Sequence, residues 1–218
     1  MVSKWERLAP LAGALAVPFW LAGVIFISTK AKGSEGPEIL ASYKQHSDGI
    51  LVGALLWSLG VLLFIWFLGS LRSHLFAAEG GTGRLANLVY GGGLVAAAIA
   101  MLIPAADEVG ALNKDHIDAS GASVLHHFSD AFFVATEYTL PIVFFAAAIA
   151  TFRYAALPKW LGWFSVLIGI VLLIGPIGWA ALIFATPIWT LIVSVLLWRR
   201  AQAPAAATTR EPAISAAS

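Results

Sequence analysis

Charged residues divide the chain into long apolar runs, with little of the alternation that marks half-buried strands. A helix rises about 1.5 Å per residue and the hydrocarbon core of a bilayer is about 30 Å thick, so roughly 18 to 25 uncharged apolar residues can cross it. Three such runs occur in the first 153 residues, and a fourth is interrupted only by Glu137. They predict membrane-spanning helices at residues 8–28, 50–71, 85–106 and 131–152.

The longest uncharged run covers 39 residues, from Trp160 to Trp198. As one helix it would measure about 58 Å, which is nearly two bilayers. The glycines and proline of residues 175–178 favour a turn near its middle. We therefore predict a fifth span at 158–174 and a sixth at 179–198, which completes one domain over residues 1–200. Residues 201–218 are rich in alanine, proline, threonine and serine, and we expect a disordered cytoplasmic tail there.

Composition favours the same fold class, an all-α, polytopic transmembrane helical bundle. Apolar residues make up 60% of the chain and charged residues 11%, against roughly 25% charged in soluble domains. The net charge of +1 and the lack of a long run of one sign exclude electrostatic capture of nucleic acid. The absence of cysteine excludes disulfides, thiolate metal sites, iron–sulfur clusters and a cysteine nucleophile.

The distribution of lysine and arginine predicts how the chain lies in its bilayer. With a cytoplasmic N-terminus, the inner segments hold nine basic residues and the outer segments hold four. Cytoplasmic segments of membrane proteins carry the excess of basic residues, so this asymmetry supports that orientation. With six spans, both termini are predicted to be cytoplasmic, in a multi-pass protein of a bacterial plasma membrane.

Small residues recur along one face of the third predicted span. Gly92, Ala96 and Ala100 follow one another every four residues, as do Gly93 and Ala97. Small residues let helix backbones approach closely in lipid, so we expect this span to sit centrally in the bundle. The same spacing leaves open a homo-oligomer or a membrane-protein partner.

Three stretches resemble a large group of uncharacterised bacterial membrane proteins of actinobacterial type. They are FLGSLRSHLFAAEGGTGRLA at residues 67–86, LPKWLGW at 157–163 and GPIGWAALIFATPIWTLIVSVLLWRR at 175–200. The chain is also similar, more distantly, to a six-span family classed as a domain of unknown function. The resemblance implies the fold and the membrane location, and it implies no catalytic residue.

Glu137 is the ionisable residue that lies well inside a predicted span. A charge at such depth costs at least about 2.5 kcal/mol near the bilayer centre, so the side chain should face the bundle. We expect it to be protonated at neutral pH or to reach water through an outer cavity. Two roles would explain an acidic residue at this depth. Glu137 is either a transport site for protons or cations, or a hydrogen-bonded residue that fixes helix packing. Its candidate partners are Trp57, Ser58, Tyr138, Thr186 and Trp189.

Histidines and carboxylates gather on the predicted outer side. His126, Asp130 and Glu137 lie at i, i+4 and i+11, on one helix face. With His46 and His127, the outer members of this stripe are candidate ligands for a divalent metal such as Zn²⁺, which could activate water for hydrolysis. The alternative, favoured by the lack of an HExxH spacing, is that these are solvated residues near a helix entry. No other cofactor is predicted.

These features favour an integral membrane protein of non-enzymatic type, acting as an accessory, sensory or packing module. Two alternatives stay open. One is a small proton- or cation-coupled transporter that uses Glu137, and the other is a metal-dependent membrane hydrolase with an outer-face His/Asp site.

Overall fold

The computed structural model describes residues 4–31 and 33–202. Every regular element in these ranges is a helix, which confirms the prediction of an all-helical chain. The predicted tail lies outside the described residues except for Ala201 and Gln202, which end the last helix. The helices are α1 (Lys4–Leu8), α2 (Leu11–Lys30), α3 (Gly36–Glu79), α4 (Arg84–Leu112), α5 (Ala119–Thr139), α6 (Pro141–Tyr154), α7 (Lys159–Leu172), α8 (Gly175–Ala180), the π-helix η1 (Ala181–Ala185) and α9 (Thr186–Gln202).

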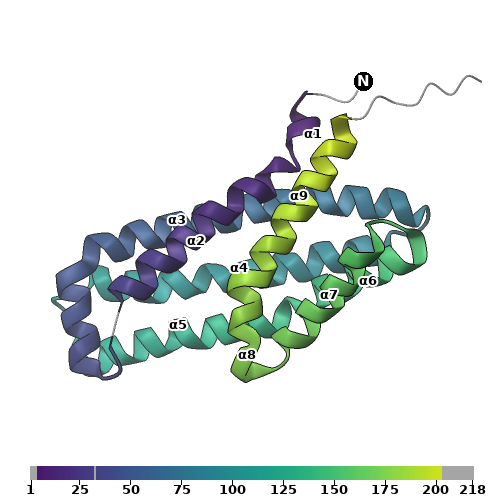
Figure 1. Cartoon of the computed structure of the whole chain (residues 1–218). Coiled ribbons are helices and arrows are strands. Elements are labelled where there is room, and N and C mark those ends of the chain that lie inside the picture. Colours follow the sequence, from purple (N-terminus) through teal and green to yellow (C-terminus); the bar gives the residue numbers. More distant parts are fainter. Residues whose placement is uncertain (1–3, 32, 203–218) are drawn as a thin grey trace, which may run out of the picture.

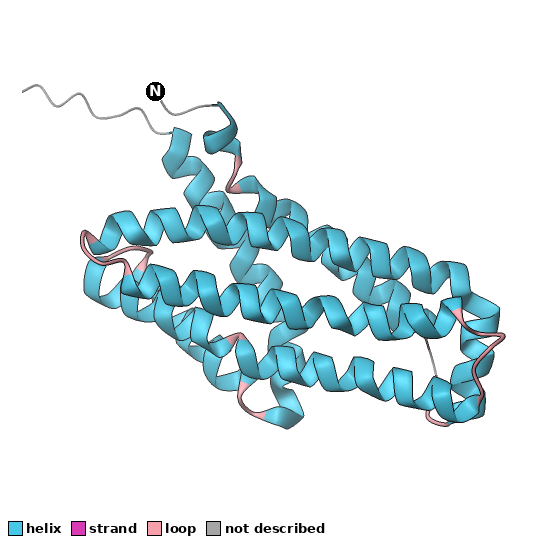
Figure 2. Cartoon of the chain, turned by 180° about the vertical axis from the view of Figure 1, so that it is seen from behind, coloured by secondary structure: helices cyan, strands magenta, loops and turns pink. Residues whose placement is uncertain are grey.

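The helices form an elongated bundle (Figure 1). The loop between α3 and α4 lies at one end, and the loop between α4 and α5 lies at the other (Figure 2). We call the first the arginine end, because it carries Arg72, Arg84, Arg153, Arg199 and Arg200. We call the second the acidic end, because it carries Glu35, Glu38, Asp107, Glu108, Asp115 and Asp118.

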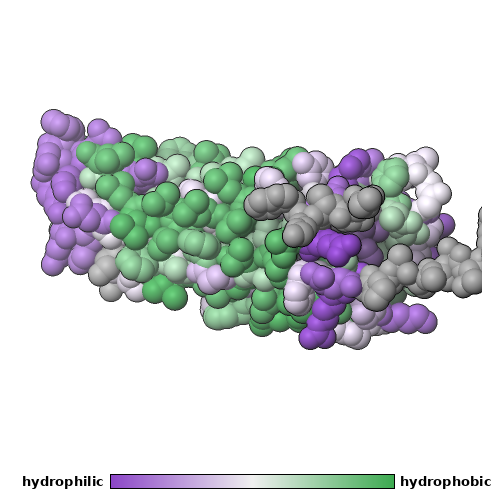
Figure 3. All heavy atoms as spheres, turned by 90° about the horizontal axis from the view of Figure 1, so that it is seen from above, coloured by the Kyte–Doolittle hydropathy of each residue, from purple (hydrophilic) through white to green (hydrophobic). Residues whose placement is uncertain are grey.

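Five helical segments in the described ranges are long and apolar enough to cross a membrane. They are Leu11–Thr29, Gly36–Glu79, Arg84–Leu112, Ala119–Tyr154 and Gly175–Gln202, while α7 is apolar but has only 14 residues. An apolar belt separates the two hydrophilic ends of the surface (Figure 3). The helices also run past the predicted spans, most of all the 44-residue α3, because their polar ends continue the helix beyond the apolar segment.

The break in the longest apolar run is tighter than the predicted turn. α7 ends at Leu172 and α8 begins at Gly175, so only Leu173 and Ile174 separate the two helices. Pro176 lies in the first turn of α8, where its missing N–H costs nothing and its fixed φ suits a helix. The glycines and proline of this segment therefore start the next helix instead of forming the turn.

Helices α2 and α3 approach each other closely, because each has a glycine that faces the backbone of the other. A Cβ on Gly23 would lie 2.6 Å from the Trp57 backbone nitrogen, and one on Gly60 would lie 2.8 Å from that of Trp20. The two tryptophan rings meet edge to face, with their centroids 6.0 Å apart. This close contact holds α2 beside α3.

The small residues of the third predicted span lie on α4 and pack within the chain. Gly93, Ala96, Ala97 and Ala100 are buried. A Cβ on Gly92 would meet Ile142 of α6, and one on Gly93 would meet Leu68 of α3. Helix α4 thus lies between α3 and α6, and it also packs on α5.

Candidate functional site

A buried carboxylate joins three helices near the acidic end. Asp107 of α4 is 1% exposed, and its Oδ1 atom accepts a hydrogen bond of 2.7 Å from the hydroxyl of Tyr43 on α3. The same atom lies 2.9 Å from Nδ1 of His126 on α5, which donates to it. We call Tyr43, Asp107 and His126 the Asp107 network.

Two local features of the backbone bring Tyr43 to Asp107. Helix α3 is kinked at His46, whose φ of −125° and ψ of 20° are not helical, so the first turns of α3 leave the axis of the rest. Gly110 lies one turn after Asp107 on α4, and a Cβ there would come within 2.3 Å of the Tyr43 ring. The absence of a side chain at Gly110 makes room for the tyrosine.

The network changes the pKa values of its two donors. Tyr43 precedes the apolar run 50–71, and His126 precedes the apolar run 131–152. Burial, together with the nearby Asp107, raises the pKa of Tyr43, so the hydroxyl keeps its proton. The hydrogen bond with Asp107 raises the pKa of His126 above its ordinary value of 6.5, against the opposing effect of burial. Asp130 adds to the rise through its charge. His126 therefore gains a proton more readily than a free histidine.

The second carboxylate oxygen of Asp107 is left without a partner among the described residues. Its Oδ2 atom is buried and accepts no hydrogen bond, although a buried acceptor without a donor costs about 1–3 kcal/mol. Asp107 and His126 both line a cavity of about 140 Å³ between α2, α3, α4 and α5. We call this cavity the outer pocket. Its lining residues are Val24, Ile27, Ser28, Ala31, Trp57, Ile103, Asp107, His126, Ser129, Asp130 and Phe133.

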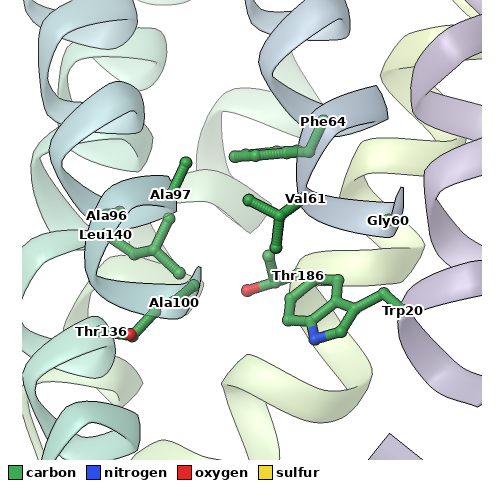
Figure 4. A pocket seen from close by; sticks show the side chains of 10 residues that line it. All are labelled: Trp20, Gly60, Val61, Phe64, Ala96, Ala97, Ala100, Thr136, Leu140 and Thr186. Carbon is green, nitrogen blue, oxygen red and sulfur yellow. The ribbon is translucent and has the colours of Figure 1, made fainter. Parts of the chain in front are cut away.

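A second, smaller cavity of about 30 Å³ is lined by residues of the same four helices, by Leu140 and by Thr186 of α9. In Figure 4 the side chains of Trp20, Val61 and Phe64 face those of Ala97 and Leu140 across it. Trp20 Nε1 and Thr186 Oγ1 line this central cavity and have no hydrogen-bond partner among the described residues. Its volume exceeds the 10–15 Å³ or so that one water needs. The Trp20–Trp57 pair contributes one ring to each cavity.

Glu137 lines neither the outer pocket nor the central cavity. It is 2% exposed, and its carboxyl packs against Gly178 of α8, where a Cβ would lie 2.6 Å from Oε2. Two of its candidate partners bond elsewhere, since Trp57 Nε1 donates to Ala100 O and Trp189 Nε1 donates to Ser165 Oγ. No described residue donates a hydrogen bond to the Glu137 carboxyl.

The candidate metal ligands are spread over the acidic end. His127 is exposed and its Nδ1 lies 2.7 Å from Ser123 O, within its own helix. His46 is at the kink of α3, where its Nδ1 is buried without a partner. Asp130 is exposed and shares the outer pocket with His126. Within residues 4–31 and 33–202, no three histidine or acidic side chains are grouped so that they could hold a metal ion.

Asp107 and Tyr43 were not among the residues that the sequence indicated as candidates. The sequence offers little indication of the contact between Tyr43 and Asp107, because the two residues are 64 positions apart and belong to different helices. Gly110, in register with Asp107 on α4, was the local sign that a bulky ring comes close there.

A second polar contact lies at the arginine end of the same α3. Arg200 Nη1 donates to Ala156 O at 2.8 Å, and it lies 2.8 Å from Nε2 of His74. Burial lowers the pKa of His74, which lies between the apolar runs 50–71 and 85–106. We call His74, Ala156 and Arg200 the Arg200 contact. Helix α3 thus carries one partner of each polar group, Tyr43 at one end and His74 at the other.

Comparison with known proteins adds no further constraint on the site. No family model, no curated protein and no solved structure matches this chain.

Proposed function

We propose that this protein is a sensory module of a bacterial plasma membrane, with six spans and both termini in the cytoplasm, that responds to a solute at its outer face. Besides the five long apolar segments, the proposal requires α7, the predicted fifth span, to cross the membrane, and its 14 residues measure about 21 Å. A span this short is accommodated by local thinning of the bilayer. The arginine end is then cytoplasmic, in keeping with the excess of basic residues on that side, and the acidic end faces outward.

The observation that carries the proposal is the Asp107 network. The Asp107 carboxylate on α4 accepts hydrogen bonds from α3 and α5. Removing one partner leaves a buried polar group unpaired. Protonation of the carboxylate, or binding of a ligand to it, therefore affects the positions of the three helices. The pocket that this carboxylate lines gives a solute access to it. Helix α3, with its kink at His46, connects Tyr43 to the Arg200 contact at the other end of the bundle.

Two observations favour a sensory module over a transporter and over a metal-dependent hydrolase. A transporter that uses Glu137 needs a path to this residue, whereas its carboxyl is packed against Gly178 and lines neither cavity. That position supports a packing role for Glu137. A metal-dependent hydrolase gains no support from the spread positions of His46 and His127.

A distance measurement between two spin labels tests the proposal. The chain has no cysteine, so Ala77→Cys on α3 and Lys159→Cys on α7, both exposed at the arginine end, take labels without background. The outer face of the reconstituted protein is then titrated from about pH 8.5 to about pH 5.5, the range in which histidine gains its charge. The titratable groups near His126 are Asp107, Asp130, Tyr43 and the neighbouring His127, whose ring centroid lies 6.4 Å away.

We expect the distance between the two labels to change with a midpoint above 6.5 in the parent protein, since Asp107 raises the pKa of His126. Asp107→Asn should abolish the change. Asp115→Asn, which removes an exposed carboxylate at the same end, should leave it intact. A distance that is constant across the titration in the parent would refute a sensory role for the network.

A further inference from the structure

The outer pocket has the chemistry of a site for a small organic cation. We propose that it binds a small alkylammonium ion that still carries an N–H, with that N–H donated to Oδ2 of Asp107. The inference rests on the proposed function, since it names the class of solute that the outer face would receive.

The unpaired oxygen of Asp107 is the first argument. Oδ1 already accepts hydrogen bonds from Tyr43 and His126, so Oδ2 is the carboxylate atom that is left to accept one from a ligand in the pocket that Asp107 lines. Oδ2 is buried and has no donor among the described residues. A ligand with a hydrogen-bond donor would supply the missing partner of Oδ2. A charged donor makes a stronger hydrogen bond to a carboxylate than a neutral donor does.

The charge of the lining is the second argument. Asp107 and Asp130 are the two acidic side chains of the pocket, and His126 is its basic one. Its Nδ1 proton is already donated to Asp107. Among the described side chains, no lysine or arginine lines the pocket. The described lining therefore carries a net negative charge whether or not His126 is protonated, and it attracts a cation.

The walls of the pocket match the organic part of such a cation. Trp57 and Phe133 supply two aromatic rings, and Val24, Ile27 and Ile103 supply aliphatic surface. The face of an aromatic ring attracts a cation within about 6 Å, and tryptophan does so best. A bare metal ion would gain nothing from these apolar walls, whereas an alkylammonium ion would bury its carbon atoms against them.

The size of the pocket limits the ligand to a few carbon atoms. Its volume is about 140 Å³, close to the roughly 150 Å³ of an engineered cavity that accepts benzene. Drug-sized ligands occupy pockets of about 300–1,000 Å³. Isopropylammonium is therefore a suitable probe, and larger polyamines are not.

The test compares three probes by titration calorimetry on the purified full chain. Isopropylammonium carries both the charge and the N–H, tetramethylammonium keeps the charge without an N–H, and isopropanol keeps a hydrogen-bond donor without the charge. We expect isopropylammonium to bind and each of the other two to bind at least about tenfold more weakly, as the loss of one charge-assisted hydrogen bond predicts. Equal affinity for isopropylammonium and isopropanol would overturn the proposal, as would no binding of isopropylammonium.

Two variants locate the binding. Asp107→Asn should weaken isopropylammonium binding at least about tenfold, while Asp115→Asn should leave it unchanged. If Asp107→Asn does not fold, Asp130→Asn provides the test of the site, because it leaves the Asp107 network intact. Loss of this exposed charge should weaken isopropylammonium binding about two- to fivefold. Unchanged affinity in Asp130→Asn would then count against the site.

The outcomes separate this inference from the proposed function. If the spin-label distance follows pH but isopropylammonium does not bind, the ligand class is wrong and the sensory role stands. If isopropylammonium binds in the outer pocket while the spin-label distance stays fixed under every condition, the site stands and the sensory role fails.

Discussion

Gly60 on α3 gives a direct test of how the bundle is held together. A Cβ at this position would lie 2.8 Å from the backbone nitrogen of Trp20, about 0.6 Å short of an ordinary contact of 3.4 Å. A backbone atom cannot rotate away as a side chain can, so Gly60→Ala forces α2 and α3 apart. That movement also separates Trp20 from Trp57, whose rings belong to the central cavity and the outer pocket.

The magnitude follows from two opposing effects. Alanine is better than glycine in a helix interior by about 0.8–1 kcal/mol, whereas an extra methyl in a closely packed contact costs about 1–3 kcal/mol. Gly69, on the same helix, provides the control because a Cβ there meets nothing within 4 Å. We expect Gly69→Ala to stabilise the protein by up to about 1 kcal/mol, and Gly60→Ala to be less stable than Gly69→Ala by about 1–3 kcal/mol.

The assay is equilibrium unfolding by denaturing detergent in mixed micelles, followed by tryptophan fluorescence. The free energies of unfolding of the two variants are compared under identical micelle conditions. If Gly60→Ala is as stable as Gly69→Ala, then α2 and α3 do not approach as closely as described and the reasoning is refuted.

Two further predictions concern Glu137 and His126. Gly178→Ala should be destabilising because its Cβ would lie 2.6 Å from Oε2 of Glu137. Glu137→Ala should relieve much of that loss, with a coupling free energy of about 0.5–3 kcal/mol in a double-mutant cycle, and simple additivity would contradict the contact. Because the pKa of His126 is raised in the folded state, its contribution to stability is fully present below about pH 6.5 and is lost as the pH rises through the folded pKa. Thermal unfolding should therefore show a decline in Tm above that pH which is smaller in His126→Gln, and an identical decline would argue against this linkage.

The helices could be predicted from the sequence because lipid imposes a simple rule on chain length and polarity. Each predicted span is mostly helical, and the run from Trp160 to Trp198 breaks at Leu173 and Ile174, just before the turn predicted at residues 175–178. The ends of the helices could not be predicted in this way. Outside the bilayer, hydropathy does not determine where a helix ends. Local features determine the helix boundary there, such as Gly80 in the left-handed conformation at the end of α3.

The site was harder to predict than the fold because its parts are distant in sequence. The polar stripe through His126 indicated the correct face of α5, since His126 and Asp130 do line a common pocket. Glu137, the third member of that stripe, packs against Gly178 of α8 and does not line this pocket. The contribution of Tyr43 depends on the kink at His46 and on the space beside Gly110, and neither can be read from helix periodicity.

The measurement that tests the account most directly is the accessibility of Ser28→Cys to a membrane-impermeant maleimide in intact cells. Ser28 is exposed and lines the outer pocket beside Asp107, and Ser73→Cys supplies a matched exposed position at the arginine end. We predict that Ser28→Cys is labelled from outside and is protected by isopropylammonium, while Ser73→Cys is labelled only after lysis. Labelling of Ser28→Cys only after lysis would contradict the orientation, and labelling that isopropylammonium does not slow would contradict the occupancy of the pocket.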